Sequence, residues 1–145
     1  TLDGLRGKMV VLDFWSERNG EEEQSYRLME TLYRLYGRDG VVVIGIHDYT
    51  GDIEAVRRAV RERGITCPVA VDAQSPNAGS RGRMFDAFRF TGFPHQVIID
   101  RGGLVNMPGI ASDDHVPTGP AAPGGPADQL DIESKVRRMH HTAAR

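Results

Sequence analysis

Short apolar runs alternate with helical patterns over the first 110 residues of the chain. The run Met9–Trp15 is apolar at consecutive positions rather than at alternating ones, so it predicts a strand buried on both faces at the centre of a sheet. Similar runs predict four further strands at Val41–Ile46, Pro68–Asp72, Gln96–Asp100 and Leu104–Met107. A proline begins one of them, which suits either an edge strand or the first position of a strand. A glycine-containing turn between the last two predicts a hairpin.

Helical periodicity predicts three helices between these strands. The first runs from about Glu21 to Tyr36, with Asn19 as N-cap and Gly37 as its end, and its predicted inner face is Leu28, Met29, Leu32, Leu35 and Tyr36. The second is capped by Asp52 and ends at Gly64, and its inner stripe is Ile53, Val56 and Val60. The third covers about Arg81–Arg89 and turns Met84, Phe85 and Phe88 inward. The order predicts an α/β fold with a central mixed sheet flanked by helices.

The composition changes after Pro108, which predicts three parts of the chain. Residues 1–110 form the folded domain, and 111–130 are a Pro/Gly-rich linker or tail without apolar periodicity. Its prolines recur every third residue, which suits a stiff polyproline II spacer or, less favoured, a ligand for a proline-recognising domain. Residues 131–145 hold a short C-terminal helix, with Val136 on its apolar side.

Two separated segments resemble the TlpA and AhpC/TSA (redoxin) branch of the thioredoxin-like superfamily. Leu5–Trp15, LRGKMVVLDFW, is similar to the family's first strand, and Gly92–Gly103, GFPHQVIIDRGG, is similar to its second hallmark. The stretch Val41–Asp72 resembles the insertion that distinguishes this branch from minimal thioredoxins. The resemblance implies a thioredoxin-like fold in which Pro94 is a cis-proline that faces the active site.

The chain departs from this family at the redox motif. Counted from Trp15, the two cysteines of the family's Cys-x-x-Cys motif are replaced by Asn19 and Glu22, and the chain contains only one cysteine. Neither an amide nor a carboxylate can attack or resolve a disulfide. We therefore predict a degenerate active site without catalytic residues, whose positions are Trp15, Asn19, Gly20, Glu21, Glu22 and Pro94.

Cys67 is the candidate thiol, next to the proline that starts the third predicted strand. A buried free cysteine acts as a small apolar residue, and we favour that role over a reactive or peroxide-sensing thiol. Polar residues also follow the predicted strand ends and would converge around Pro94: Asn19, Glu21, Glu22, His47, Asp48 and His95. They could bind a metal or form an acid–base pair, but we favour solvated residues of a disused groove and predict no metal and no cofactor.

Composition limits the classes of partner. The net charge of −2 gives no basic field for nucleic acid or for an anionic membrane surface, and no apolar run approaches the ~20 residues that span a bilayer. We expect neither a nucleic-acid partner nor a membrane span within this segment. The chain begins at Thr1, so we expect a longer protein, and the resemblance suggests an extracytoplasmic or membrane-tethered context. The sequence leaves the compartment open.

Two functions remain. The favoured one is a non-catalytic module of a larger protein that binds a peptide or protein partner in the groove around Pro94. The alternative is a thiol–disulfide oxidoreductase or peroxidase in cell redox homeostasis, which would use Cys67 or the thiols of a partner.

Overall fold

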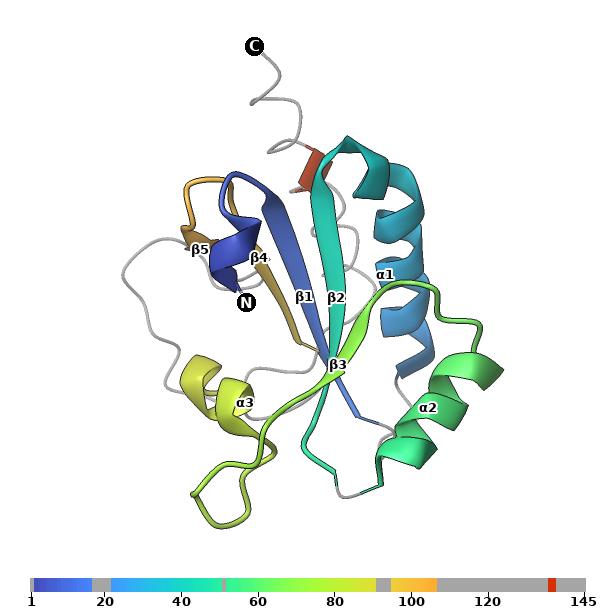
Figure 1. Cartoon of the computed structure of the whole chain (residues 1–145), viewed down its shortest axis with the longest axis vertical. Helices are drawn as coiled ribbons and strands as arrows, with labels where there is room; N and C mark the ends of the chain where they lie inside the picture. The colour runs from blue at the N-terminus through green and yellow to red at the C-terminus, as the bar shows by residue number, and fades with distance from the viewer. Residues whose placement is uncertain (1, 17–21, 51, 91–94, 107–135, 138–145) are drawn as a thin grey trace.

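Five strands form one mixed sheet at the centre of the molecule (Figure 1). The computed structural model describes residues 2–16, 22–50, 52–90, 95–106 and 136–137. The sheet order is β3-β2-β1-β4-β5, and the strands are β1 (Met9–Trp15), β2 (Val41–His47), β3 (Val69–Val71), β4 (His95–Ile99) and β5 (Val105–Asn106). The first three are parallel, whereas β4 and β5 are antiparallel to their neighbours. The predicted central position of the first strand is confirmed, and the third strand lies at an edge of the sheet, one of the two places that its proline suited.

The helices cover both faces of this sheet, as the α/β prediction requires. One face packs against α1 (Glu22–Tyr36) and α2 (Ile53–Glu62), and the other against α3 (Arg83–Phe88) and the short 3-10 helix η1 (Leu2–Leu5). A second 3-10 helix, η2 (Gly37–Asp39), follows α1. None of the helices in the described part of the chain has the length and apolar character needed to cross a membrane.

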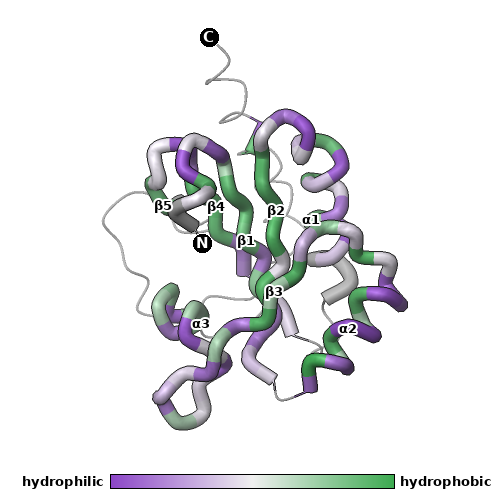
Figure 2. The backbone as a smooth tube through the Cα atoms, viewed as in Figure 1, coloured by the Kyte–Doolittle hydropathy of each residue, from purple (hydrophilic) through white to green (hydrophobic). Residues whose placement is uncertain are grey.

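Alternation along β1 divides the core into two clusters. Met9, Val11 and Trp15 face α1 and α2, whereas Val10, Leu12 and Phe14 face α3. Every residue of β1 is buried, because side chains alternate between two covered faces. The strands are accordingly apolar over most of their length (Figure 2).

A glycine in β2 lets α1 approach the sheet. Gly45 pairs with Asp13 of β1, and a Cβ atom at Gly45 would lie 3.0 Å from both Met29 Sδ and Trp15 Nε1. Such contacts are tighter than most real Cβ contacts, so the missing Cβ lets the indole ring and the α1 methionine close over β2 without a shift.

The short helix α3 is attached to the end of β3 by a buried carboxylate. Asp72 accepts hydrogen bonds from the backbone N–H groups of Ala73 (2.7 Å), Met84 (2.8 Å) and Phe85 (3.2 Å), two of which belong to the first turn of α3. Gly82 adopts a φ of 151° beside this carboxylate, and a Cβ atom there would collide with it. The contact therefore fixes both the residue type at 82 and the direction in which α3 leaves the sheet.

Two residues of the predicted inner faces are exposed. Leu35 is 54% exposed, because it follows Met29 by six residues and lies about 120° around the helix from it. Ile53, the first residue of α2, is 50% exposed. The predicted end of the first helix is confirmed, since α1 ends at Tyr36, and the 3-10 turn that follows ends at Gly40, which has a φ of 86°.

A residue near the end of the chain completes the first core cluster. Val136 and Arg137 are helical, and Val136 is 0% exposed among the residues that face α1 and α2 (red in Figure 1). The rest of the predicted C-terminal helix and the Pro/Gly-rich segment 111–130 lie outside the described residues. The core thus includes a side chain well beyond residue 110.

Candidate functional site

The candidate site lies where β1 and β2 end side by side. Trp15 is paired with His47 in the parallel ladder, and the Asp48 N–H donates a 3.0 Å hydrogen bond to the Trp15 carbonyl. All of these residues and Ser16 are buried. Open α/β sheets place their ligand sites at the carboxyl edge of their parallel strands. This cluster is therefore the candidate functional site.

Trp15 is clamped between two rings. The Tyr26 ring of α1 meets it edge-on at a centroid distance of 5.0 Å, and the His47 ring meets it edge-on at 4.4 Å. The Arg63 guanidinium lies over the Tyr26 ring, 5.1 Å from its centroid. Such edge-to-face contacts hold an aromatic ring in one orientation, so Trp15 is a rigid apolar wall beside the strand ends.

His47 and Asp48 form a buried imidazole–carboxylate pair. His47 Nδ1 lies 3.1 Å from Asp48 Oδ1 and 2.8 Å from the Asp48 carbonyl oxygen. Because both neighbours are acceptors, we assign a proton to Nδ1. Close by, Trp15 Nε1 and Ser16 Oγ are buried and have no hydrogen-bond partner among the described residues.

His95, which was expected to converge with His47, lies on the opposite face of the sheet. It is paired with Phe14 rather than with Trp15, and adjacent residues of a strand face opposite sides. Its ring stacks on Phe90 at 4.4 Å, and burial lowers its pKa from 6.5. The described residues contain no group of three or more His, Cys, Asp or Glu that could hold a metal ion. The proposed convergence of the two histidines is therefore wrong.

Several predicted site positions fall on residues that the structure does not describe. Asn19, Gly20, Glu21 and Pro94 lie outside the described ranges, and Glu22 is the first residue of α1. Their roles remain predictions from the sequence.

Asp13 is a buried polar residue that the sequence analysis did not select. It is 2% exposed, and its Oδ1 accepts a 2.6 Å hydrogen bond from Gln96 Nε2 of β4. It shares the sheet face of Trp15, two residues further along the same strand. The sequence did contain a signal for this role, because Asp13 is a carboxylate in a run that is otherwise apolar. A charge buried in such a strand needs a specific partner.

The only thiol is protected by its surroundings. Cys67 is 4% exposed, and burial, followed by the nearby Glu30 carboxylate, raises its pKa from 9.0 to about 12. Cys67 precedes β3 by two residues, and the Glu30 and Asp13 carboxylates both act on its thiol. A thiol with this pKa is protonated at neutral pH and is a poor nucleophile.

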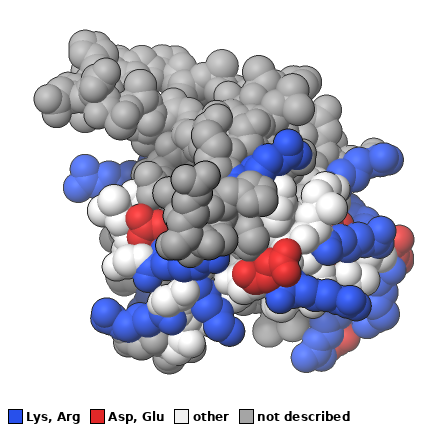
Figure 3. All heavy atoms as spheres, turned by 90° about the horizontal axis from the view of Figure 1, so that it is seen from above, with Lys and Arg blue, Asp and Glu red and all other residues white. Residues whose placement is uncertain are grey.

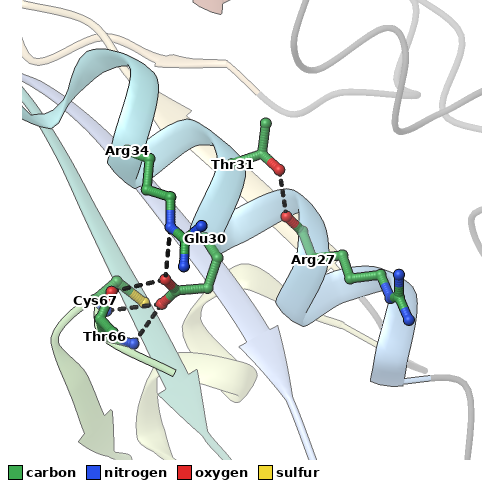
Figure 4. A network of polar contacts seen from close by, with 6 residues as sticks. All are labelled: Arg27, Glu30, Thr31, Arg34, Thr66 and Cys67. Carbon is green, nitrogen blue, oxygen red and sulfur yellow. Dashed lines mark hydrogen bonds and ion pairs between the residues drawn. The ribbon is translucent and has the colours of Figure 1, made fainter. Parts of the chain in front are cut away.

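Glu30 of α1 holds the backbone at Thr66 and Cys67 (Figure 4). Its carboxylate accepts hydrogen bonds from the Thr66 N–H (2.5 Å), the Thr66 hydroxyl (2.7 Å) and the Cys67 N–H (2.8 Å), and Arg34 lies 3.9 Å away. Burial would raise the pKa of Glu30, but these hydrogen bonds outweigh it and lower the pKa from 4.5. The contacts tie α1 to the start of β3.

Comparison with known proteins gives sequence relatives and similar structures. No protein-family model matches the sequence. The thiol-disulfide oxidoreductase ResA of Bacillus thuringiensis (strain Al Hakam) is 32% identical over 104 residues, which are 72% of this chain and 56% of that protein. ResA of Geobacillus kaustophilus (strain HTA426) is 27% identical over 107 residues, 73% of this chain and 56% of that protein. The chain thus spans a little over half the length of these relatives.

Solved structures agree on the fold. A thiol-disulfide isomerase from Corynebacterium glutamicum matches with a TM-score of 0.64 and 28% identity over 74% of this chain and 73% of the other. A thioredoxin-family thiol:disulfide interchange protein from Chlorobium tepidum TLS matches with a TM-score of 0.64 and 20% identity, over 95% of this chain and 83% of the other. The second match shows the fold alone. The ResA relatives and the Corynebacterium glutamicum structure show that this chain belongs to the thioredoxin-like superfamily, in its branch of TlpA-, DsbE- and ResA-type proteins.

Proposed function

We propose that this thioredoxin-like domain binds an extended peptide or protein segment at the carboxyl edge of β1 and β2 and performs no thiol–disulfide exchange of its own. The observation that carries the proposal is the state of its single cysteine. Exchange needs an accessible thiolate and a second thiol that resolves the mixed disulfide. Cys67 is buried and protonated at neutral pH, and it is the only thiol of the sequence.

Binding without exchange requires only the walls of the site. Trp15, Ser16 and the His47–Asp48 pair are buried at the ends of β1 and β2, so they would support this site from within. An extended segment bound beside Pro94 would use backbone hydrogen bonds for affinity and the side chains around it for specificity. Asn19 and Glu22 would then line the position where relatives of the family carry their cysteines.

The alternative proposal keeps redox chemistry. The similarity to ResA favours an oxidoreductase that works through Cys67 or through thiols supplied by a partner. The two proposals differ in one respect that can be measured with this chain alone, because only the alternative allows turnover that depends on Cys67.

Reduction of insulin by dithiothreitol tests the proposal. We expect the chain and its Cys67→Ser variant to give only the rate of dithiothreitol alone. The matched control is the double substitution Asn19→Cys and Glu22→Cys, which restores a dithiol at the predicted positions beside the start of α1. We expect this variant to accelerate the reaction.

Two outcomes would contradict this proposal. Turnover by the unmodified chain that disappears in Cys67→Ser would show that the chain is an oxidoreductase and not a binding module. Inactivity of the double variant, with its circular dichroism unchanged, would show that residues 19 and 22 are not the former cysteine positions.

A further inference from the structure

An apolar groove lies between α2 and β3, away from the candidate site. It has a volume of about 520 Å³, and its lining consists of Ile53, Val56, Arg57, Val60, Arg61, Cys67, Val69 and Val71. The α2 residues in this lining follow helical spacing, so they form one stripe along that helix. Because β3 is only three residues long, part of this stripe extends past the sheet. We call this feature the α2–β3 groove.

The backbone beside the α2–β3 groove is the open edge of the sheet. β3 is the first strand in the sheet order, and β2 already uses the Pro68 carbonyl (2.9 Å from Gly45 N) and the Asp72 N–H (2.9 Å from the His47 carbonyl). Along a strand, alternate residues direct their backbone groups to opposite neighbours. Val69 and Val71 therefore present their N–H and C=O groups to the open side, while their side chains line the groove.

The rim of the groove carries positive charge. Arg57 is paired with Glu54 at 2.6 Å, whereas the Arg61 guanidinium has no ion-pair partner among the described residues. Basic side chains also cover more of the described surface than acidic ones in the view from above, although the net charge is −2 (Figure 3). A second copy of the chain would bring the same arginines to the same edge, so like charges disfavour self-pairing there.

We propose that the α2–β3 groove and the open edge of β3 together bind an extended segment of a partner protein, with apolar residues at alternate positions and an acidic residue on the same face. The added strand would pair with the free backbone groups of Val69 and Val71. Its apolar side chains would enter the groove beside Val60, and its carboxylate would face Arg61. This surface is separate from the carboxyl edge and does not depend on the function proposed above.

Nuclear magnetic resonance with a synthetic peptide tests this proposal. The probe is Ac-Thr-Val-Thr-Val-Thr-Glu-Thr-NH2, which as a strand places both valines and the glutamate on one face. Titration into the ¹⁵N-labelled chain should shift the amide signals of Val69 and Val71. Arg61→Glu should weaken binding by about fivefold or more, whereas the matched charge reversal Arg58→Glu, at an exposed position outside the groove lining, should change it by less than about twofold.

Two isomeric probes test the backbone pairing without any change to the protein. One carries N-methyl groups on residues 3, 5 and 7, and the other on residues 2, 4 and 6. An added strand uses the N–H groups of only one set, so one isomer should lose binding and the other should retain it. Equal binding by both isomers would overturn the proposal. So would shifts confined to the Trp15–Asp48 edge, equal effects of the two arginine substitutions, or a dimer through β3 in the peptide-free chain.

Discussion

Replacing Glu30 tests whether one carboxylate fixes the start of β3. Its Oε1 accepts both backbone N–H groups, of Thr66 and Cys67, and its Oε2 accepts the Thr66 hydroxyl. Glu30→Gln keeps one oxygen for the two backbone donors but places an amide donor where Oε2 accepts the Thr66 hydroxyl, and it loses the charge, so we expect a cost of about 1 kcal/mol in the free energy of unfolding. Glu30→Ala removes three hydrogen bonds. Because Thr66 is exposed and water can replace part of them, we expect about 2–3 kcal/mol rather than the sum.

The pKa of Glu30 makes the same prediction depend on pH. A carboxylate whose pKa is lowered by folding stabilises the protein fully above its unfolded value of 4.5, and this contribution is lost as the pH falls through the folded pKa. The difference between the unmodified chain and Glu30→Gln should therefore be full at pH 7 and shrink in acid below pH 4.5. Urea unfolding followed by circular dichroism at both pH values measures it.

A matched control separates this network from surface charge in general. Glu54 is paired with Arg57 at 2.6 Å, but both side chains are 64% exposed. Glu54→Gln should cost less than about 0.5 kcal/mol at either pH, since exposed pairs contribute little. If Glu30→Ala were no more costly than this control, or equally costly in acid and at neutral pH, the carboxylate would not hold β3.

Three further predictions concern single residues. Gly82→Ala should destabilise the chain by about 3 kcal/mol or more because its Cβ would strike Asp72, whereas Gly79→Ala, also at positive φ (75°) but with open space around it, should cost about 1 kcal/mol in urea unfolding. Cys67 should react with iodoacetamide at pH 8 at least about 100-fold more slowly than in urea, and equal rates would contradict its burial. Since burial lowers the pKa of His95 below its unfolded 6.5, stability should fall as the pH drops through that value, and His95→Phe should reduce the fall; an unchanged pH dependence would contradict the assignment.

The strand pattern could be predicted from the sequence because its signal is local. Seven consecutive buried residues make β1 a central strand, and Pro68 marks the edge strand. The N-cap of α2 was equally local, since Asp52 accepts the Ala55 N–H at 2.9 Å. Each of these features depends on residues that are close together in the sequence, so a short stretch of the chain is enough to predict it.

The features that were missed depend on distant parts of the chain. Whether Ile53 is covered depends on the length of β3, which no pattern in α2 records. The opposite placement of His47 and His95 follows from strand register, since each is paired with a different neighbour in β1. The partner of Asp13 is 83 residues away, so its buried hydrogen bond could not be foreseen from the strand alone.

The burial of Val136 bears on how the protein is made. Met9 and Val11 leave the ribosome before Val136, which lies 125 residues after Val11 and belongs to the same cluster. Closing so long a loop is slow compared with forming local contacts. The face of the sheet beneath α1 and α2 therefore stays partly open at least until Val136 has been synthesised.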